Sequence, residues 1–258
     1  MILNDRQKGI IETLVVKENI SVEELSSLFK VSTVTIRNDL TYLSNHGHVI
    51  RTHGGARIFT ERVRQEYSFA TRQRLNATSK KKIGELAATL IEPNDSVLLD
   101  SSSTAVAVAQ AIRRLHISYE ISVFVTGIWT ALELLGDPHI HVIVPGGNVR
   151  ETTGSFTGNL TKEFLKKFNF NKALLGAWGV DVQEGLTDTQ VPEVELKQDI
   201  IARSREVIGL VDSSKFGRIG LLSFATTEQI NTIVTDKSIP SEYINLFNNK
   251  SVQLLIAK

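Results

Sequence analysis

The chain has 258 residues, of which 41% are hydrophobic, and its formal net charge is +1 at pH 7. It contains no cysteine, which excludes disulfide bonds, thiolate nucleophiles and Cys-ligated zinc. No stretch is apolar for long enough to cross a membrane, and the start, MILNDRQKGI, does not resemble a signal peptide. We therefore expect a cytoplasmic protein with no membrane partner.

The charge is unevenly distributed along the chain. Residues 1–75 hold eleven Lys and Arg against eight Asp and Glu, whereas the remainder holds eighteen against twenty. The excess lies in residues 48–75, where six arginines face two glutamates. Such a basic segment is a modest electrostatic footprint for phosphates. For residues 62–74, a solvated charged linker explains the same excess equally well.

Taken in order, the chain begins with a helix predicted over residues 5–16, which Asp5 caps. Ser21 and Glu24 form the pattern of a capping box, which opens a short second helix. The apolar positions of these two helices are Ile10, Ile11, Leu14, Leu25, Leu28 and Phe29. Lys30 and Val31 make a tight turn, in which Val31 can fill the angle between two helices.

The next predicted helix starts at Ser32 and ends at Gly47, a residue typical of helix C-termini. Val34, Ile36, Leu40 and Leu43 supply its apolar positions. Residues 48–53 then alternate like a strand, and Gly54-Gly55 turns into a second strand at residues 56–58. These elements predict a helix-turn-helix with a wing, ending near Ile58.

The third helix carries short hydroxyls, an arginine and an asparagine near its front, which suits insertion into a DNA major groove. An ordinary helical hairpin with a solvated polar face would show the same spacing. The lack of acids at the front of the helix and the basic hairpin behind it favour DNA binding. The residues predicted to contact DNA are Ser32, Thr33, Thr35, Arg37, Asn38 and Tyr42 on the helix and Arg51, His53 and Arg57 on the wing.

The run VEELSSLFKVSTVTIRNDLTYLSNHGHVIRTHGGA resembles the N-terminal domain of the DeoR family of bacterial transcriptional regulators. Its specific parts are the helix start TIRNDL and the wing RTHGGA. The resemblance implies double-stranded operator DNA as a partner. Because one winged domain contacts only a short half-site, we also expect a homo-oligomer, either a dimer or a tetramer.

We predict a linker at residues 59–78 and a second domain at residues 79–258, where strands and helices alternate. Helices are expected at 80–91, 105–115, 129–135, 160–168, 193–206 and 241–247. Strands are expected at 96–99, 121–125, 140–144, 172–175, 207–211, 232–234 and 252–256. This alternation is typical of an open, mainly parallel sheet with helices on both faces.

Polar and glycine residues follow strand after strand of this second domain: DSSST, TG, PGGN, GAWG and DSSK. In doubly wound sheets, ligands bind along that carboxyl edge. DSSST precedes a helix, so its amides and hydroxyls can hold an anion, and Lys215 offers a charge to the same anion. Each loop alone could be a plain turn, but five on one edge favour a pocket for a small, anionic, hydroxylated ligand.

The second domain is similar to DeoR-family effector-binding domains through LLDSSST, VTG, VPGGNVR, LLGAWGVD, EGLTD, EVELK at 193–197 and VDSSKFGR. The resemblance implies a fold similar to ribose-5-phosphate isomerases and a repressor of carbohydrate catabolism that a phosphorylated sugar releases from DNA. The implied phosphate loop comprises Asp100, Ser101, Ser102, Ser103 and Thr104. The residues implied around the sugar are Thr126, Gly146, Gly147, Gly176, Lys197, Asp212 and Lys215.

This chain departs from the family pattern at three positions. Ser102 stands where glycine is usual, Gly127 where asparagine is usual, and Trp178 where aspartate is usual. Trp178 could stack on a sugar face, or it could be a packing residue. These substitutions bear on the effector contacts rather than on the scaffold.

An enzyme is the main alternative to a sensor. Asp100, Asp212, Glu193, Glu195 and Lys215 are groups that could transfer protons in aldose–ketose isomerisation. Glu193 to Lys197 reads more simply as an acidic helix start with an i,i+4 pair, and an attached DNA-binding domain favours a sensor. An architectural DNA binder without a ligand leaves the polar sheet edge unexplained. The histidines show no metal-ligand spacing, so we expect no metal and no cofactor.

Overall fold

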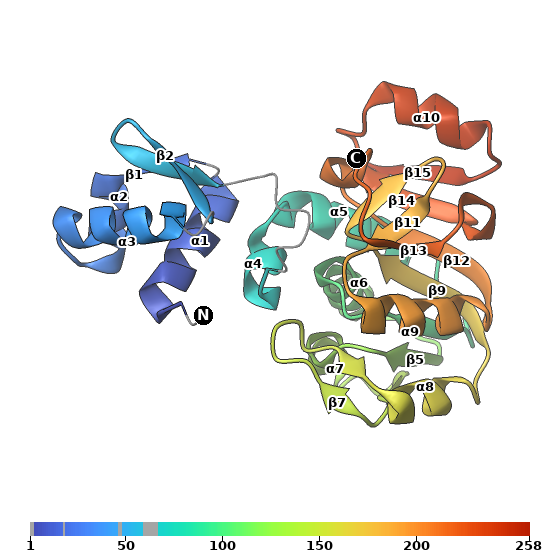
Figure 1. Ribbon diagram of the computed structural model, residues 1–258. Helices are drawn as coiled ribbons and strands as arrows, with labels where there is room; N and C mark the ends of the chain where they lie inside the picture. The colour runs from blue at the N-terminus through green and yellow to red at the C-terminus, as the bar shows by residue number, and fades with distance from the viewer. Residues whose placement is uncertain (1–2, 18, 46–47, 59–66) are drawn as a thin grey trace. The chain divides into compact units, whose positions relative to one another are not determined.

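The computed structural model describes residues 3–17, 19–45, 48–58 and 67–258, and the chain forms two compact units, Met1–Leu75 and Asn76–Lys258 (Figure 1). The first unit contains the helices α1 (Asp5–Lys17), α2 (Val22–Phe29), α3 (Thr33–Asn45) and α4 (Phe69–Arg74). It also contains the strands β1 (Asn19–Ser21), β2 (Val49–Thr52) and β3 (Gly55–Ile58).

Two of the three predicted N-caps of the first unit are confirmed, and the third is wrong. Asp5 is the first residue inside α1, and Asn4 caps this helix, because Asn4 Oδ1 accepts the amide of Gln7 at 2.9 Å. Ser21 Oγ accepts the Glu24 amide at 3.1 Å and Glu24 accepts the Ser21 amide at 3.1 Å, which is the reciprocal capping box. Ser32 Oγ accepts the amide of Thr35 at 3.1 Å at the start of α3. Lys30 ends α2 with a left-handed φ of 54°, so the turn between the helices is tight. The predicted C-terminal glycine of α3, Gly47, lies outside the described residues.

The core of the first unit is built from the apolar faces of α1, α2 and α3. Ile10, Leu14, Leu25, Ile36, Leu40 and Leu43 are fully buried. Burying such a side chain stabilises the unit by about 1.5–3 kcal/mol. Two predicted core residues are wrong, because Leu28 is 56% exposed and Val34 is 61% exposed. Ile36, Leu40 and Leu43 already fill the buried face of α3, which leaves Val34 on the outer face.

The wing is larger than predicted. β2 and β3 pair as the expected antiparallel hairpin, and β1, which was not predicted, pairs with β3 to give the order β1-β3-β2. Gly55 is required at this junction, because a Cβ there would lie 2.2 Å from the carbonyl oxygen of Ile20. Because β1 lies between α1 and α2 in the chain, its pairing with β3 attaches the wing to the helices.

The predicted linker, residues 59–78, divides into three parts. Residues 59–66 lie outside the described residues. Residues 67–75 group with the first unit, where Ser68 caps α4 and Phe69 and Thr71 are buried. The second unit starts at Asn76, and its first helix, α5, covers Ala77–Ala88. The helix α4 could not be predicted from the sequence, because its few apolar residues lie in a stretch that is mostly polar.

The second unit is an α/β domain around a seven-stranded parallel sheet in the order β15-β14-β12-β9-β4-β5-β6 (Figure 1). The strands are β4 (Ser96–Leu99), β5 (Ile121–Val125), β6 (Ile140–Ile143), β9 (Phe170–Gly176), β12 (Ser204–Leu210), β14 (Thr232–Asp236) and β15 (Gln253–Ala257). The helices that follow α5 are α6 (Ser103–Leu115), α7 (Ile128–Leu134), α8 (Asn159–Leu165), α9 (Val191–Ile201) and α10 (Ser241–Asn248).

Two apolar layers cover the two faces of this sheet. One layer joins α5, α6 and α7 to Val97 and Leu99 of β4, and the other joins α8, α9 and α10 to Leu98. The alternation follows from the strand period of two, and the strands are apolar on both faces because both are covered. The predicted parallel sheet with helices on both faces is confirmed.

Several elements differ from the prediction. The helix predicted at 193–206 ends at Ile201, and β12 already begins at Ser204. Short antiparallel strands were missed altogether: the pair β7 (Asn148–Val149) and β8 (Phe156–Thr157), and the sheet β10-β11-β13 made of Gly179–Asp181, Gly185–Asp188 and Leu222–Ala225. Strands of two to four residues carry too little alternation to be recognised.

Candidate functional site

The outer face of α3 presents the side chains predicted for DNA. Arg37 and Asn38 are exposed, and Thr33 is half-buried. Ser32 and Thr35 bond to each other through their hydroxyls at 2.9 Å, so they shape the helix start. Tyr42 packs against the core of the unit, which leaves only part of its surface open. Val34, which the sequence placed in the core, joins this face and offers an apolar contact of the kind that recognises a thymine methyl group.

A buried aspartate fixes α3 against α1. Asp39 is 5% exposed and accepts hydrogen bonds from Arg6 Nε at 2.5 Å and from Gln7 Nε2 at 3.2 Å. Arg6 also donates through Nη2 at 3.3 Å, so the pair is bidentate. Asp39 was not among the predicted residues, because an acid within a polar helix face looks like a solvated residue.

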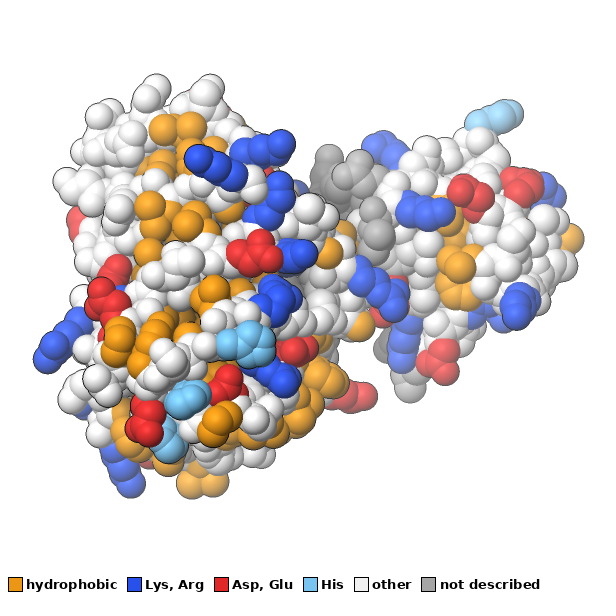
Figure 2. All heavy atoms as spheres, turned by 180° about the vertical axis from the view of Figure 1, so that it is seen from behind, with side chains coloured by type: hydrophobic (Ala, Val, Ile, Leu, Met, Phe, Trp, Pro, Cys, Tyr) orange, Lys and Arg blue, Asp and Glu red, His pale blue; other side chains and the backbone are white. Residues whose placement is uncertain are grey.

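The wing is tied to α3 by Arg51. Its Nη1 donates to the carbonyl oxygen of Arg37 at 3.1 Å and to Thr41 Oγ1 at 2.9 Å. Arg51 therefore positions the wing on α3, a role that the sequence did not indicate. His53 and Arg57, the other predicted wing residues, are exposed. On the face of this unit seen in Figure 2, several Lys and Arg side chains stand among uncharged atoms and few acids.

In the second unit, the sheet order reverses between β4 and β9. From β4 the chain proceeds to β5 and β6 on one side, and from β9 to β12, β14 and β15 on the other. The crevice at the carboxyl ends of two such strands is the usual ligand position in open α/β sheets. Asp100 follows β4 and Gly176 ends β9, so two of the predicted effector residues lie at this point. Asp100 Oδ2 accepts the amide of Gly176 at 2.9 Å.

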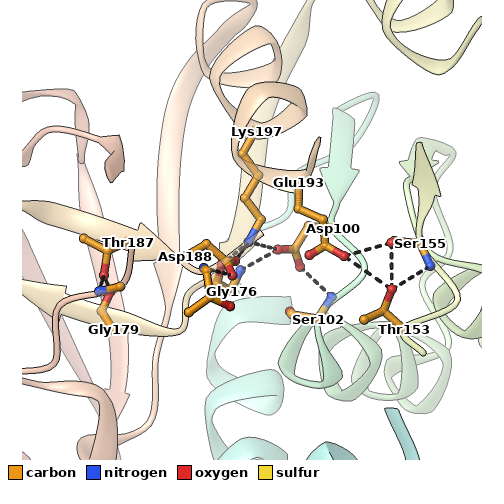
Figure 3. A network of polar contacts seen from close by, with 12 residues as sticks. Asp100, Ser102, Thr153, Ser155, Gly176, Gly179, Thr187, Asp188, Glu193 and Lys197 are labelled. Carbon is orange, nitrogen blue, oxygen red and sulfur yellow. Dashed lines mark hydrogen bonds and ion pairs between the residues drawn. The ribbon is translucent and has the colours of Figure 1, made fainter. Parts of the chain in front are cut away.

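Lys197 connects the groups at this switch point. Its Nζ donates to Asp188 Oδ2 at 2.8 Å and to the carbonyl oxygen of Gly176 at 2.8 Å, and lies 3.3 Å from Asp100 Oδ2 (Figure 3). Nζ also lies 4.5 Å from the centre of the Phe224 ring. Burial alone would lower the pKa of Lys197, but the carboxylates of Asp188, Asp100 and Glu193 outweigh it and raise that pKa above its ordinary value. Lys197 thus orients two carboxylates.

In the loop DSSST, side chains of the loop itself accept hydrogen bonds from some of the nearby backbone amides. Asp100 Oδ1 accepts the amide of Ser102 at 3.0 Å, and Ser102 Oγ caps α6 by accepting the amide of Ala105 at 3.0 Å. Ser101, Ser103 and Thr104 are buried beside them. A side chain on Gly176 would approach Ser102 Cβ to 2.4 Å, so the serine that departs from the family pattern packs directly on β9.

A second carboxylate, Glu193, lies beside Asp100 (Figure 3). It accepts from Arg150 Nη1 at 2.6 Å and from Ser155 Oγ at 2.8 Å, and Thr153 Oγ1 lies at 3.3 Å. Arg150 and Ser155 lie in the loop between β7 and β8, which is thereby joined to the start of α9. The structure assigns polar partners to Glu193 that the sequence could not indicate, because they lie about forty residues away along the chain.

The other predicted effector residues are spread along the same edge. Thr126 is buried at the end of β5, next to Asp100. Gly146 and Gly147 are exposed after β6, two strands from β4, and Gly146 accepts a hydrogen bond from Thr161. Half-buried Trp178 donates its amide to the Thr187 carbonyl group.

Asp212 and Lys215 lie one strand beyond Gly176, after β12. Asp212 is buried and accepts from Ser214 and Asn76, while Lys215 is half-buried in a short 3-10 turn. With adjacent strands about 4.8 Å apart, this turn lies about 10 Å from the DSSST loop. A ligand the size of a sugar phosphate can span that distance.

Of the acids proposed for an isomerase, Glu193 lies beside Asp100 and Asp212 follows β12, whereas Glu195 lies elsewhere. Glu195 is exposed and pairs with Lys162 on α8, away from the Asp100 carboxylate that Lys197 orients. Among the residues that the structure describes, no group of three His, Asp or Glu could hold a metal ion. Within the same residues, no helix is long and apolar enough to cross a membrane.

A winged helix-turn-helix on one unit and a polar switch-point site on the other define a ligand-responsive DNA-binding regulator. Comparison with known proteins agrees. The DeoR-like helix-turn-helix domain matches residues 6–62, and the DeoR C-terminal sensor domain matches residues 75–237. The chain belongs to the DeoR family of transcriptional regulators.

Two relatives that match over nearly their whole length support this assignment. The HTH-type transcriptional regulator GolR of Listeria innocua is 36% identical over 98% of both chains. A putative aga operon transcriptional repressor of Escherichia coli O157:H7 is 29% identical over 98% of this chain and 93% of its own. Among solved structures, ribose 5-phosphate isomerase A of Methanocaldococcus jannaschii is 17% identical with a TM-score of 0.40, covering 55% of each chain.

Proposed function

We propose that this protein represses genes of carbohydrate use and that a phosphorylated sugar releases it from its operator. The observation that carries the proposal is one polypeptide holding an exposed Arg37–Asn38 face on α3 and a buried polar site at a sheet switch point. Relatives named as repressors of the aga operon and of the glycerol-3-phosphate regulon support the same direction. Its action on chromosomal DNA would take place in the cytoplasm.

We place the sugar at the carboxyl edge between β4, β9 and β12. Asp100, Glu193 and Asp188 offer acceptors for hydroxyl groups, and Lys197 holds two of these carboxylates in place. The part of the site around Lys197 carries more acids than cations, which would repel a phosphate. We therefore place the phosphate at the periphery of the site. The start of α6, with Ser103 and Thr104, and Lys215 in the β12 loop are the groups we assign to it.

The test is a titration of the full chain bound to a labelled duplex that has been selected from a random-sequence library. Ribose 5-phosphate, fructose 6-phosphate, glucose 6-phosphate, galactosamine 6-phosphate and glycerol 3-phosphate are added in turn, each beside its unphosphorylated form. We expect at least one phosphate to release the duplex and its free form to fail. Release by the free sugar at equal concentration would remove the phosphate from the proposal.

We also propose that the site binds its ligand without turning it over. Asp212, one of the candidates for proton transfer, is held by Asn76 and Ser214. Incubating the full chain with ribose 5-phosphate and glucose 6-phosphate, and following ketose formation by NMR, should show no conversion. Conversion that Asp212→Asn abolishes would establish an isomerase instead.

The DNA-binding proposal assigns base contacts to Arg37 and a homo-oligomer to the operator complex, because one wing and helix cover only a half-site. Arg37→Ala should weaken binding to the selected duplex by about 1–3 kcal/mol if Arg37 contacts a guanine. Binding to random duplex should change much less. Light scattering of the DNA complex should give two or more copies; a single copy would refute the oligomer.

A further inference from the structure

The first residue of the larger unit, Asn76, has an uncommon conformation and an uncommon hydrogen-bond partner. It lies at the N-cap of α5 with a left-handed φ of 50°. An N-cap asparagine ordinarily accepts an amide of the helix it starts. Here its Nδ2 instead donates to Asp212 Oδ1 at 2.8 Å and to Ser214 Oγ at 3.1 Å. The start of α5 is thus bound to the loop after β12.

Asp212 makes this bond a strong one. It is 2% exposed, and its Oδ1 also accepts the Ser214 amide at 3.1 Å and the Ser214 hydroxyl at 2.5 Å. Hydrogen bonds to a carboxylate are roughly twice as strong as neutral ones. Asp212 caps the 3-10 turn that carries Lys215, and Ser214 lies within that turn. The Asn76 side chain therefore holds the turn that we assign to the effector phosphate.

A second contact ties the same turn to α5. Asp236, at the end of β14, accepts the Ser213 amide at 2.8 Å and the Ser238 amide at 2.9 Å. The hydroxyl of Ser79, one helical turn after Asn76, also bonds to Asp236. The first turn of α5 is therefore connected to the β12 loop at two points, directly through Asn76 and through Asp236.

On its other side, Asn76 follows the DNA-binding unit with almost no spacer. α4 ends at Arg74, and Leu75 closes it by donating its amide to Thr71 at 3.1 Å. α4 belongs to the first unit: Phe69 is 7% exposed, and Ser68 Oγ donates to Glu12 of α1 at 3.1 Å. One residue separates this packed helix from Asn76, so a displacement of Asn76 acts directly on the chain that enters the first unit.

We propose that Asn76 is a positioning residue that couples occupancy of the sensor site to DNA binding, by tying the chain entering the sensor to the Asp212–Lys215 loop. The inference rests on the proposed function, because it takes this loop as part of the effector site. Ligand that reorganises the loop changes the Asn76 contact and, through it, the attachment of α4. Coupling between two sites is reciprocal, so DNA binding must alter the same loop in the absence of any sugar.

That reciprocity allows a test without knowledge of the sugar. Hydrogen exchange of the full chain is measured with and without a duplex selected from a random library, following the amides of residues 213–217. Several of these amides are hydrogen-bonded, including those of Ser213, Ser214 and Lys215, so their exchange reports opening of the loop. We expect DNA to change their exchange rates by about fivefold or more, the lower end of typical coupling.

Asn76→Gly removes the amide group while keeping a residue that tolerates positive φ. We expect it to abolish the DNA-dependent change in the loop and to leave affinity for the duplex unaltered. Asn76→Asp, which sets a carboxylate against Asp212, should do the same and covers the case in which the glycine variant folds poorly. Asn94→Gly is the matched control, since Asn94 has a φ of 63° in a turn at the opposite edge of the sheet.

Two results would overturn the inference: loop exchange that DNA leaves unchanged in the parent chain, or a change of equal size in both Asn76 variants. A purely structural role for Asn76 would raise exchange of the loop in both states alike, without affecting the response to DNA. Failure of the proposed function has a separate signature, because it appears as duplex that no sugar phosphate releases. The two outcomes are therefore distinguishable.

Discussion

Lys197 donates to a carbonyl group and to Asp188 within 2.8 Å, and it lies beside Asp100, so its bonding capacity is used inside the protein. Sequence comparison placed Lys197 around the sugar as a contact. The geometry favours a positioning role, because the Lys197 side chain is 6% exposed and its ammonium group has carboxylates on two sides. Removing Lys197 would therefore leave the buried carboxylate of Asp100 and the partly buried carboxylate of Asp188 without their cation.

Lys197→Met should therefore lower the free energy of unfolding by about 3–5 kcal/mol, the cost of breaking a buried ion pair. Urea unfolding of the full chain, followed through the transition of the larger unit, measures this loss. Lys162→Met is the matched control, since Lys162 pairs with exposed Glu195 and should cost at most about 1 kcal/mol. Equal losses in the two variants would contradict the positioning role.

We expect Asp236 to make the free energy of unfolding depend on pH. Burial alone would raise the pKa of Asp236, but the amides of Ser213 and Ser238 outweigh it and lower that pKa. A lowered folded-state pKa stabilises the protein above the unfolded value, about 3.9, and the contribution disappears as the pH falls through the folded pKa.

We expect Asp236→Asn to lose about 1.5–3 kcal/mol at neutral pH, since it removes hydrogen bonds to a charged group. The variant should also show a smaller decline in stability than the parent chain as the pH falls below about 5. Urea unfolding at a series of pH values measures both effects. Parallel curves for the two proteins would show that Asp236 does not titrate as described.

At the scale of elements, Arg51 joins the wing to α3, whereas Arg57 is exposed on β3. Arg57→Ala should reduce the slope of log affinity against log salt by about one unit, as one phosphate contact is lost. Arg51→Ala should weaken binding with little change in that slope, because its Nη1 is bonded to α3.

Thr41→Val should reproduce the Arg51 effect, since Thr41 Oγ1 is the other partner of that guanidinium. Fluorescence anisotropy with the selected duplex at several salt concentrations gives both quantities. A slope reduced by one unit in Arg51→Ala, and unchanged binding in Thr41→Val, would show that Arg51 contacts phosphate directly.

Elements defined by local signals could be predicted, and those defined by partners could not. Ser21 with Glu24 and Ser32 fix helix starts within the chain itself, and β4 and β5 match their predicted bounds. Val34 was misplaced because a valine at helical spacing fits the core or a recognition face equally well. β10 pairs with β11, and β11 pairs with β13, which no short window of sequence reveals.

For the whole molecule, the periodicity of apolar residues predicted two domains and a parallel sheet. It did not predict which side chains bond to one another in the site. The loops after the strands were identified from their Gly, Ser and Asp residues, and Asp100 does meet Gly176 at the switch point. The partners of Glu193 and the bond from Asn76 to Asp212 span 38 to 136 residues. Contacts over such separations depend on the packed sheet rather than on neighbouring residues.

The response of the whole molecule to its ligand depends on the groups that hold the effector phosphate. If Lys215 binds the effector phosphate, Lys215→Ala removes one charged contact worth about 1.5–3 kcal/mol and should weaken effector binding by about one to two decades. Ser103→Ala removes a neutral hydroxyl and should cost less, about 0.5–1.5 kcal/mol. Because both residues lie in the sensor unit, affinity for DNA without ligand should stay the same. Both variants should then remain on the operator at ligand concentrations that release the parent chain.

Anisotropy of the labelled duplex, titrated with whichever of the five sugar phosphates releases the parent chain, measures this shift. Lys167→Ala is the control, since Lys167 is an exposed lysine that precedes β9 at the opposite edge of the sheet and should leave release unaltered. The mechanism requires only that the sugar phosphate bind the DNA-free state more tightly than the DNA-bound state. If Lys215→Ala releases DNA at the same concentration as Lys167→Ala, the phosphate does not bind at the β12 loop.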